Sequence, residues 1–280
     1  MALVSTAWLA EHLDDPDIVV ADVRWYLSGR RGIDEYRRGH IPGAFFVDLE
    51  RELCGPSGPG RHPLPTPQGF AALLSRLGVS PSTRVVAYDD AGGAIAARLW
   101  WLLRYFRHEG ALVLDGGIDG WRAEGRPLST VVPPDRGAAT LALSPSAELV
   151  VDAARVAELL SEAGSVVIDA RAPERFTGRE EPVDPRPGHI PDARNVPFSD
   201  NLEQGRFRAV GALRERYARV GAINAQTVVV YCGSGVTACH DLLALSLLGR
   251  NDALLYEGSW SDWSSDPKRP AALGEESVDA

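Results

Sequence analysis

Short runs of β-branched and other apolar residues alternate along the chain with longer stretches in which apolar residues recur at helical spacing. The short runs predict buried strands at residues 19–24, 84–88, 166–171 and 227–231. The longer stretches predict helices at residues 69–77, 97–106, 152–163 and 237–248. Strands that alternate with helices are typical of βαβ units. The pattern therefore predicts an α/β fold with mostly parallel central sheets flanked by helices.

The predicted elements occur twice, in the same order. The matched segments are 19–24 and 166–171, 39–44 and 188–193, 84–88 and 227–231, and 114–121 and 256–263. The second copy carries a few extra residues before its His-Ile-Pro sequence, which begins at His189. A repeat of this length corresponds to a whole domain and not to a solenoid unit. The chain is therefore expected to hold two tandem domains.

Prolines and glycines separate the two copies. Pro133, Pro134, Gly137 and Pro145 interrupt any periodic pattern in this part of the chain. We expect a first domain at residues 1–130, a linker at residues 131–146 and a second domain at residues 147–280.

Composition and charge narrow the class of protein. The chain has 280 residues, 45% of them hydrophobic and 24% charged, which is typical of globular proteins. Its formal net charge of −9 makes nucleic acid an unexpected partner. No apolar run approaches the roughly 20 residues that span a bilayer, and no secretory signal is visible at the start. The three cysteines, Cys54, Cys232 and Cys239, argue against a disulfide framework and against structural zinc, and favour a reducing cytoplasm.

Cys232 carries the strongest chemical signal. It ends the predicted strand at residues 227–231, and two glycines, Gly233 and Gly235, separate it from the next predicted helix. Ligands of α/β folds bind at the carboxyl ends of strands. The glycines are expected to allow positive φ values that turn backbone N–H groups inward, and the helix start adds its positive end. Such a cradle favours the thiolate, which is the nucleophilic form of cysteine.

With these residues the chain resembles the rhodanese family, and within it the 3-mercaptopyruvate sulfurtransferases. The resemblance covers nearly the whole sequence and rests on the Cys232 loop, the repeated His-Ile-Pro sequence and the segment at residues 258–260. It implies two rhodanese-like domains and a sulfurtransferase without a metal or organic cofactor. Sulfur would pass from 3-mercaptopyruvate to Cys232 and then, from the persulfide, to cyanide, thioredoxin or another thiol. The loop residues expected to bind substrate are Gly233, Gly235, Val236 and Thr237.

The first copy lacks the cysteine. Asp89 stands at the position that Cys232 occupies in the second copy. A carboxylate cannot accept a sulfane sulfur, so the first domain is expected to be catalytically inactive. This agrees with the tandem members of the family, in which the C-terminal domain is the catalytic one.

Arginines are the expected ligands of the donor's carboxylate, because a guanidinium binds a carboxylate through two parallel hydrogen bonds. By resemblance, Arg175 and Arg186 match the two arginines that hold mercaptopyruvate. Arg179 and Arg194 are weaker candidates. The alternative is that these arginines only pair with nearby acids on a solvated loop; those acids are Glu174, Glu180, Glu181 and Asp184.

The family also implies a route for protons. Ser234 matches its serine two residues after the cysteine, and His62 and an acid of the first domain would assist it. Glu50 is the expected acid, and Asp48 competes with it. The alternative reading of His62 is an exposed loop residue.

Three other functions share features with this sequence. A thiosulfate:cyanide sulfurtransferase would use the same site, although thiosulfate-preferring rhodaneses typically carry basic residues where this chain has Gly233 and Ser234. A protein tyrosine phosphatase needs an arginine six residues after its cysteine, and position 238 is an alanine. A non-catalytic rhodanese-like binding module fits poorly with an intact Cys232 loop. Cys239 is expected to be a small buried apolar residue and Cys54 an incidental thiol.

Overall fold

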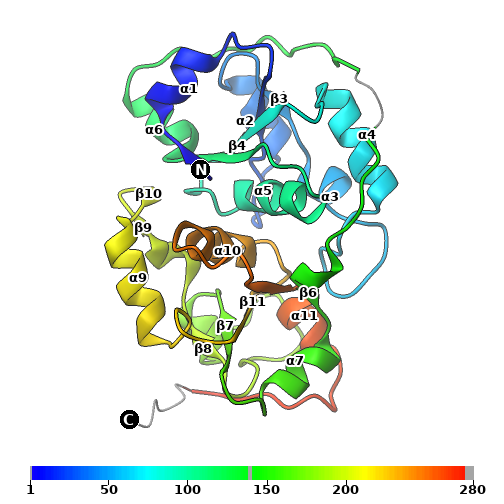
Figure 1. The fold of residues 1–280 in the computed structure, drawn as a ribbon, viewed down its shortest axis with the longest axis vertical. Helices are drawn as coiled ribbons and strands as arrows, with labels where there is room; N and C mark the ends of the chain where they lie inside the picture. The colour runs from blue at the N-terminus through cyan, green and yellow to red at the C-terminus, as the bar shows by residue number, and fades with distance from the viewer. Residues whose placement is uncertain (1, 138–140, 275–280) are drawn as a thin grey trace. The chain divides into compact units, whose positions relative to one another are not determined.

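The computed structural model describes residues 2–137 and 141–274, and these form two compact units (Figure 1). Unit 1 consists of residues 1–56, 64–146 and 203–207, and unit 2 of residues 57–63, 147–202 and 208–280. Each unit thus includes a short segment from the other half of the chain, which the repeat did not indicate. Of the expected domains and linker, residues 1, 138–140 and 275–280 lie outside the described residues.

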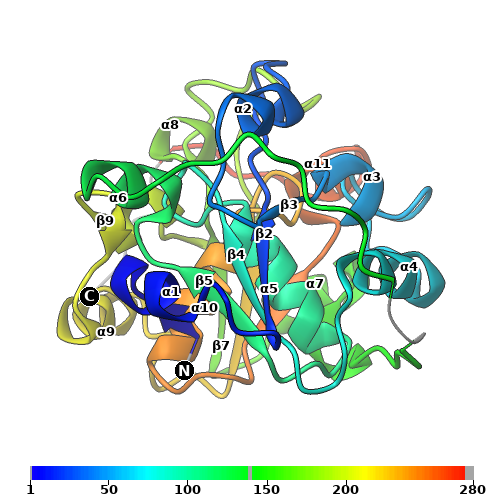
Figure 2. The same cartoon turned by 90° about the horizontal axis from the view of Figure 1, so that it is seen from above.

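Unit 1 is built on a five-stranded parallel sheet with strand order β1-β5-β4-β2-β3. Its strands are β1 (Leu3–Val4), β2 (Ile18–Asp22), β3 (Phe45–Phe46), β4 (Arg84–Tyr88) and β5 (Ala111–Leu114). Its helices are α1 (Thr6–His12), α2 (Gly32–Arg38), α3 (Leu49–Glu52), α4 (Pro67–Leu77), α5 (Ala96–Tyr105) and α6 (Gly117–Ala123). Figure 2 shows α1 beside α6 and α3 beside α4.

Unit 2 repeats this topology. Its sheet has the order β6-β12-β11-β7-β8, again with parallel pairs. Its strands are β6 (Val150–Val151), β7 (Ser165–Asp169), β8 (Arg194–Asn195), β11 (Thr227–Tyr231) and β12 (Leu254–Tyr256). Its helices are α7 (Ala153–Leu159), α8 (Pro173–Phe176), α9 (Val210–Arg219), α10 (Ala238–Leu247) and α11 (Ser259–Trp263), with 3₁₀ turns at Ala147–Leu149 and Phe198–Asn201. A two-stranded sheet pairs β9 (Leu202–Glu203) with β10 (Arg206–Phe207).

The predicted fold class is confirmed in both copies. The four predicted strands correspond to β2, β4, β7 and β11, and the predicted helices to α4, α5, α7 and α10. Strands β4 and β11 are almost entirely buried, because helices cover both faces of a parallel sheet. The largest departure is α7, which ends at Leu159, four residues earlier than predicted.

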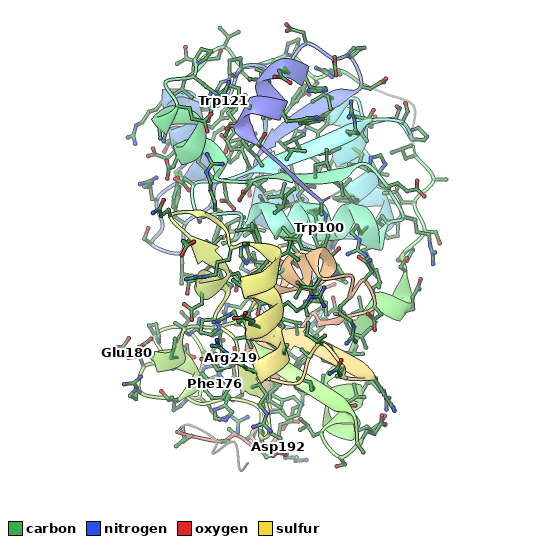
Figure 3. The ribbon with its side chains drawn as sticks, turned by 60° about the vertical axis from the view of Figure 1, so that its left-hand side comes forward. Trp100, Trp121, Phe176, Glu180, Asp192 and Arg219 are labelled. Carbon is green, nitrogen blue, oxygen red and sulfur yellow. The ribbon has the colours of Figure 1, made fainter. Side chains whose placement is uncertain are left out.

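The His-Ile-Pro repeat has the same structural contacts in each unit. His40 Nδ1 lies 2.8 Å from the carbonyl oxygen of Tyr36, and its ring stacks on Tyr36 with centroids 3.9 Å apart. His189 Nδ1 lies 2.8 Å from the carbonyl oxygen of Phe176, labelled in Figure 3, and its ring stacks on Phe176 at 3.7 Å. Both histidines are fully buried. These contacts serve the fold, as a residue present in both copies would suggest.

A buried ion pair is likewise repeated. Arg24 donates through Nε and Nη2 to Asp22, and Arg171 does the same to Asp169. Each arginine also donates to the carbonyl oxygen of the glycine that precedes the repeated histidine. Arg24 donates to Gly39, and Arg171 donates to Gly188. The pair joins the end of a central strand to the His-Ile-Pro turn.

Among the described residues, no helix combines the length and the apolar character that crossing a bilayer requires.

Candidate active site

Cys232 lies in unit 2 directly after β11, in a loop that leads into α10. Its side chain is buried and the residue is 1% exposed. The backbone of the loop is held by the start of α11: Trp260 N donates to the Cys232 carbonyl at 2.9 Å, and Ser261 N donates to the Gly233 carbonyl at 2.9 Å. Cys232 N donates to Ser259 Oγ at 3.1 Å. The sulfur therefore lies on a backbone fixed at the carboxyl end of a central strand, as the sequence predicted.

The loop contains several backbone N–H groups, and most of them have no acceptor among the described residues. Gly235 N donates to Cys232 Sγ at 3.1 Å. Across the described parts of the chain no acceptor is found for the N–H groups of Gly233, Ser234, Val236, Thr237 and Ala238. Unpaired N–H groups in a buried loop are costly unless a ligand or water receives them. The loop is thus suited to hold an anion beside Cys232.

The two glycines of the loop have different roles, which corrects the sequence prediction. Gly235 has a φ of +78°, and a Cβ there would lie 2.6 Å from the carbonyl oxygen of Glu257. Gly233 does not have a positive φ. Instead it makes room for two cations: a Cβ at Gly233 would lie 3.0 Å from Arg61 Nη2 and 3.2 Å from Arg175 Nη1.

Ser234 and His62 are brought together. His62 Nδ1 lies 2.7 Å from Ser234 Oγ, and both residues are buried. His62 comes from the segment of residues 57–63 that belongs to unit 2. Arg61 N donates to Ser261 Oγ at 3.1 Å, which attaches this segment to α11. His62 is therefore not the exposed loop residue of the alternative reading.

The two candidate acids have hydrogen bonds within unit 1. Asp48 caps α3, where Oδ1 accepts from the N–H groups of Glu50 at 3.0 Å and Arg51 at 3.2 Å. Glu50 Oε1 accepts from Trp25 Nε1 at 3.1 Å. Asp48 is thus the N-cap of α3, and this structural role accounts for its presence without a catalytic one.

Arg175, on α8, is held by two buried acids. Nη2 donates to Glu181 Oε1 at 2.7 Å and to Asp184 Oδ2 at 2.8 Å, and Nε donates to Glu181 Oε2 at 3.3 Å. Arg175 thus pairs with acids, as the interpretation of a solvated loop expects. These acids are buried, however, because the side chains of Glu181 and Asp184 are only 4% and 1% exposed. Nη1 of Arg175 has no acceptor among the residues that the structure describes.

Arg186 makes different contacts. Its Nε donates to Ser264 O at 2.9 Å, and its Nη1 to Arg269 O at 3.0 Å. Nη2 donates to Trp263 O at 3.2 Å and to Asp266 O at 3.0 Å. All three nitrogens thus bind backbone carbonyls at and after the end of α11, so the contacts of Arg186 fasten the C-terminal segment.

Sequence reasoning missed Arg61 and gave Asp184 only a pairing role. Arg61 Nη1 donates to Asp184 Oδ1, and Asp184 thereby joins Arg61 to Arg175. Burial raises the pKa of Asp184, although both arginines act in the opposite direction. The sequence offered one indication of Arg61, which is that it directly precedes the candidate residue His62.

In unit 1 the equivalent loop is already filled by a side chain. The buried carboxylate of Asp89 accepts four backbone N–H bonds, from Ala91 at 2.9 Å and from Gly93, Ile95 and Ala96 at 2.8 Å each. A carboxylate of unit 1 itself thus fills this loop, whereas most N–H groups of the equivalent loop in unit 2 have no acceptor within residues 2–137 and 141–274.

Cys239 has the buried environment that the sequence predicts for it. Cys239 is fully buried, and its Sγ donates to the carbonyl of Gly235 at 3.3 Å. Burial raises the pKa of the Cys54 thiol, which disfavours its thiolate. Within residues 2–137 and 141–274, no cluster of three or more histidine, cysteine or acidic side chains is arranged to hold a metal ion.

Comparisons with known proteins agree with this architecture. The family described as "Rhodanese-like domain" matches residues 5–124 and 152–266. A Pseudomonas aeruginosa protein provisionally named 3-mercaptopyruvate sulfurtransferase is 44% identical, over 98% of this chain and 98% of its own. A Mycobacterium tuberculosis protein provisionally named thiosulfate sulfurtransferase SseB is 41% identical, over 97% of each chain.

Among solved structures, the chain is similar to SseA from Escherichia coli, which is described as a 3-mercaptopyruvate sulfotransferase with the rhodanese fold. The two superpose with a TM-score of 0.83 at 35% identity, covering 92% of this chain and 98% of SseA. Because the family match includes both copies and relatives above 40% identity extend along nearly the whole chain, this protein belongs to the rhodanese family.

Proposed function

We propose that the protein is a sulfurtransferase that moves a sulfane sulfur from 3-mercaptopyruvate to a thiophilic acceptor through a persulfide on Cys232. The observation that carries the proposal is the Cys232 loop, in which a buried cysteine accepts a hydrogen bond from Gly235 N and is followed by further backbone N–H groups for which the described residues offer no acceptor. Relatives named for this reaction add support.

The reaction is a double displacement. The Cys232 thiolate attacks the donor's sulfur, a sulfur–sulfur bond forms, and the carbon–sulfur bond breaks. The electron pair of that bond leaves with the three-carbon product as the pyruvate enolate. The proton of the donor thiol ends on the enolate carbon, and the terminal persulfide sulfur retains the negative charge. The N–H groups of residues 233–238 would stabilise that charge, as Ala91, Gly93, Ile95 and Ala96 do for Asp89 in unit 1.

Ser234 and His62 are proposed to carry the proton, because their 2.7 Å contact lies within the loop itself. Glu50 remains the proposed acid of this route, since Asp48 is engaged as an N-cap. Arg175 is proposed to bind the donor's carboxylate. Arg186, whose nitrogens bind backbone carbonyls, would then act through the C-terminal segment it fastens.

The acceptor removes the outer sulfur and restores the thiolate. Cyanide, thioredoxin and small thiols are proposed acceptors. The first domain is proposed to be inactive, because Asp89 replaces the cysteine. We also propose the domain limits and the cytoplasmic location that the sequence suggests.

Steady-state rates with two donors test the proposal. We expect kcat/KM for 3-mercaptopyruvate to exceed that for thiosulfate, and the wild type to gain the mass of one sulfur atom when donor is supplied without acceptor. Cys232→Ser should abolish both signals, whereas Cys54→Ser should retain them. Thiosulfate sulfurtransferase activity, the name given to the Mycobacterium tuberculosis relative, is the second candidate. A higher kcat/KM for thiosulfate than for 3-mercaptopyruvate would favour this second candidate. If the wild type never gains sulfur, the protein would be a non-catalytic rhodanese-like module.

A further inference from the structure

The first turn of α11 holds a serine in a backbone conformation that normally belongs to glycine. Ser259, the first residue of this helix, has a φ of +52°. Residues with a side chain rarely adopt such values, because the Cβ crowds the backbone. Unit 1 has Gly117 at the equivalent place, the start of α6, where φ is +54°. Unit 2 thus keeps a strained side chain at a turn that glycine makes without strain in the other copy.

The Ser259 hydroxyl binds the backbone of the reactive cysteine. Its Oγ accepts from Cys232 N at 3.1 Å and donates to the carbonyl oxygen of Tyr256 at 3.0 Å. Both contacts are buried, and Ser259 itself is fully buried. Since the hydroxyl hydrogen is directed to Tyr256, a lone pair of the oxygen is available to the Cys232 N–H. The hydroxyl therefore ties the Cys232 peptide group to the end of β12.

The carbonyl at the cysteine position, by contrast, is held in the same way in both copies. Trp260 N donates to Cys232 O at 2.9 Å. In unit 1, Ile118 N donates to Asp89 O at 3.0 Å. The hydroxyl contact belongs to unit 2, because Gly117 has no side chain and a Cβ there would lie 2.3 Å from Asp89 O. The copy that carries the cysteine is therefore the copy that carries the hydroxyl.

The place of the sulfur depends on the peptide group that Ser259 holds. Cys232 Sγ accepts from Gly235 N at 3.1 Å. If the Cys232 peptide turned away from Ser259, the sulfur would move away from Gly235 N and from the other N–H groups of the loop. A strained residue persists where the surrounding structure fixes it, and such residues cluster at functional sites.

We propose that Ser259 is a positioning residue of the sulfur-transfer site, whose hydroxyl fixes the Cys232 backbone so that the sulfur stays within the loop while it is loaded and unloaded. This inference rests on the proposed function. It gives the strained turn of unit 2 a purpose that the unstrained turn at Gly117 does not serve.

Two substitutions separate the hydroxyl from the fold. Ser259→Ala removes the hydroxyl and keeps a Cβ at positive φ, whereas Ser259→Gly removes the hydroxyl and relieves the strain. Ser259→Gly should therefore have a higher Tm than Ser259→Ala. At saturating 3-mercaptopyruvate, the rate at which Cys232 gains sulfur should nevertheless fall by about 10-fold in both variants. The donor concentration that gives half the maximal rate should change by less than about 2-fold, because the buried hydroxyl contacts the protein backbone.

Ser264→Ala is the matched control. Ser264 directly follows α11, is 2% exposed, and its Oγ has no hydrogen-bond partner among the described residues. This change also removes a buried serine hydroxyl next to the same helix, and it should leave the rate of sulfur loading within about 2-fold of the wild type.

Alkylation by iodoacetamide separates this inference from the proposed function, because it needs no sulfur donor. The rate of alkylation at Cys232, located by mass spectrometry, should fall by about 3-fold or more in both Ser259 variants. It should not change in Ser264→Ala. If the wild type never gains sulfur, the proposed reaction fails, and slower alkylation of both variants would still keep Ser259 as the residue that positions Cys232.

Three results would overturn the role of Ser259. One is a Ser259→Gly variant that is loaded and alkylated at the wild-type rates, since activity would then follow stability and not the hydroxyl. Another is a loss of loading that lies mainly in the half-saturating donor concentration, which would make Ser259 a donor-binding residue. The third is an equal loss in Ser264→Ala.

Discussion

Asp241, on the helix that follows the Cys232 loop, is a fully buried acid that the proposed reaction does not use. Its Oδ1 accepts from Asn201 Nδ2 at 2.7 Å, and its Oδ2 has no partner among the described residues. Burial, the largest influence, raises the pKa of Asp241 to about 8. The folded protein therefore holds a proton there at neutral pH that the unfolded chain releases.

This proton makes stability depend on pH. Between the ordinary aspartate pKa of 3.8 and about 8, the folded state binds more protons than the unfolded state, so the free energy of unfolding falls as pH rises. The slope for one proton is about 1.4 kcal/mol per pH unit. Asp241→Asn cannot titrate and should not show this pH dependence. Its free energy of unfolding should therefore rise relative to that of the wild type as the pH rises. Urea unfolding at pH 5, 7 and 9 measures the difference, and parallel profiles for the two proteins would contradict the assignment.

At the scale of elements, the decisive unit is a strand, a loop and a helix, and the protein contains two versions of it. In unit 1 the loop between β4 and α5 spans residues 89–95, and in unit 2 the loop between β11 and α10 spans residues 232–237. The first carries its own carboxylate, whereas the N–H groups of Gly233, Ser234, Val236 and Thr237 in the second have no acceptor in the described part of the chain. The same strand, loop and helix thus stabilise the carboxylate of Asp89 in unit 1. In unit 2 they can bind an anionic ligand beside Cys232.

The geometry of the second loop depends on Gly235. Gly235→Ala would impose a positive φ on a residue with a Cβ and would drive that Cβ to 2.6 Å from the carbonyl of Glu257. Gly249→Ala is a matched control: its φ is +88°, and nothing lies within 4 Å of the added atom. The control should lose about 1–2 kcal/mol of stability from the φ strain alone and retain its kcat. Gly235→Ala should lose more stability and most of its sulfur-loading rate; equal effects of the two changes on rate would argue against a fixed loop.

At the scale of the whole molecule, duplication has placed one open and one filled anion loop in a single chain. Asp89→Asn tests this division. The amide keeps the shape of the side chain but offers one acceptor oxygen where the carboxylate offers two, and four buried N–H groups depend on them. We expect a loss of roughly 1–3 kcal/mol in stability and a kcat within about twofold of the wild type. Thermal unfolding and steady-state turnover measure both, and a large fall in kcat at unchanged stability would give unit 1 a catalytic part.

Much of the fold could be predicted because it depends on local pattern. Strands β4 and β11 are continuous apolar runs that must be buried, and each is followed by a largely apolar stretch that is long enough to form a helix. Cys232 could be placed at a strand end for the same reason. The extent of α7 could not be predicted to the residue, because helix ends depend on contacts that local spacing does not encode.

The two copies, the parallel sheets and the position of Cys232 between a strand and a helix follow from the amino-acid pattern alone. Which arginines lie beside the Cys232 loop depends on the packing of distant segments. Arg186 matches the expected motif, yet its nitrogens bind carbonyls of residues 263–269, whereas Arg61 lies far away in sequence and reaches Asp184 and the edge of Gly233. The physical reason is that a guanidinium on a long flexible side chain binds whichever acceptors packing brings near it, and those acceptors come from segments that no local pattern connects.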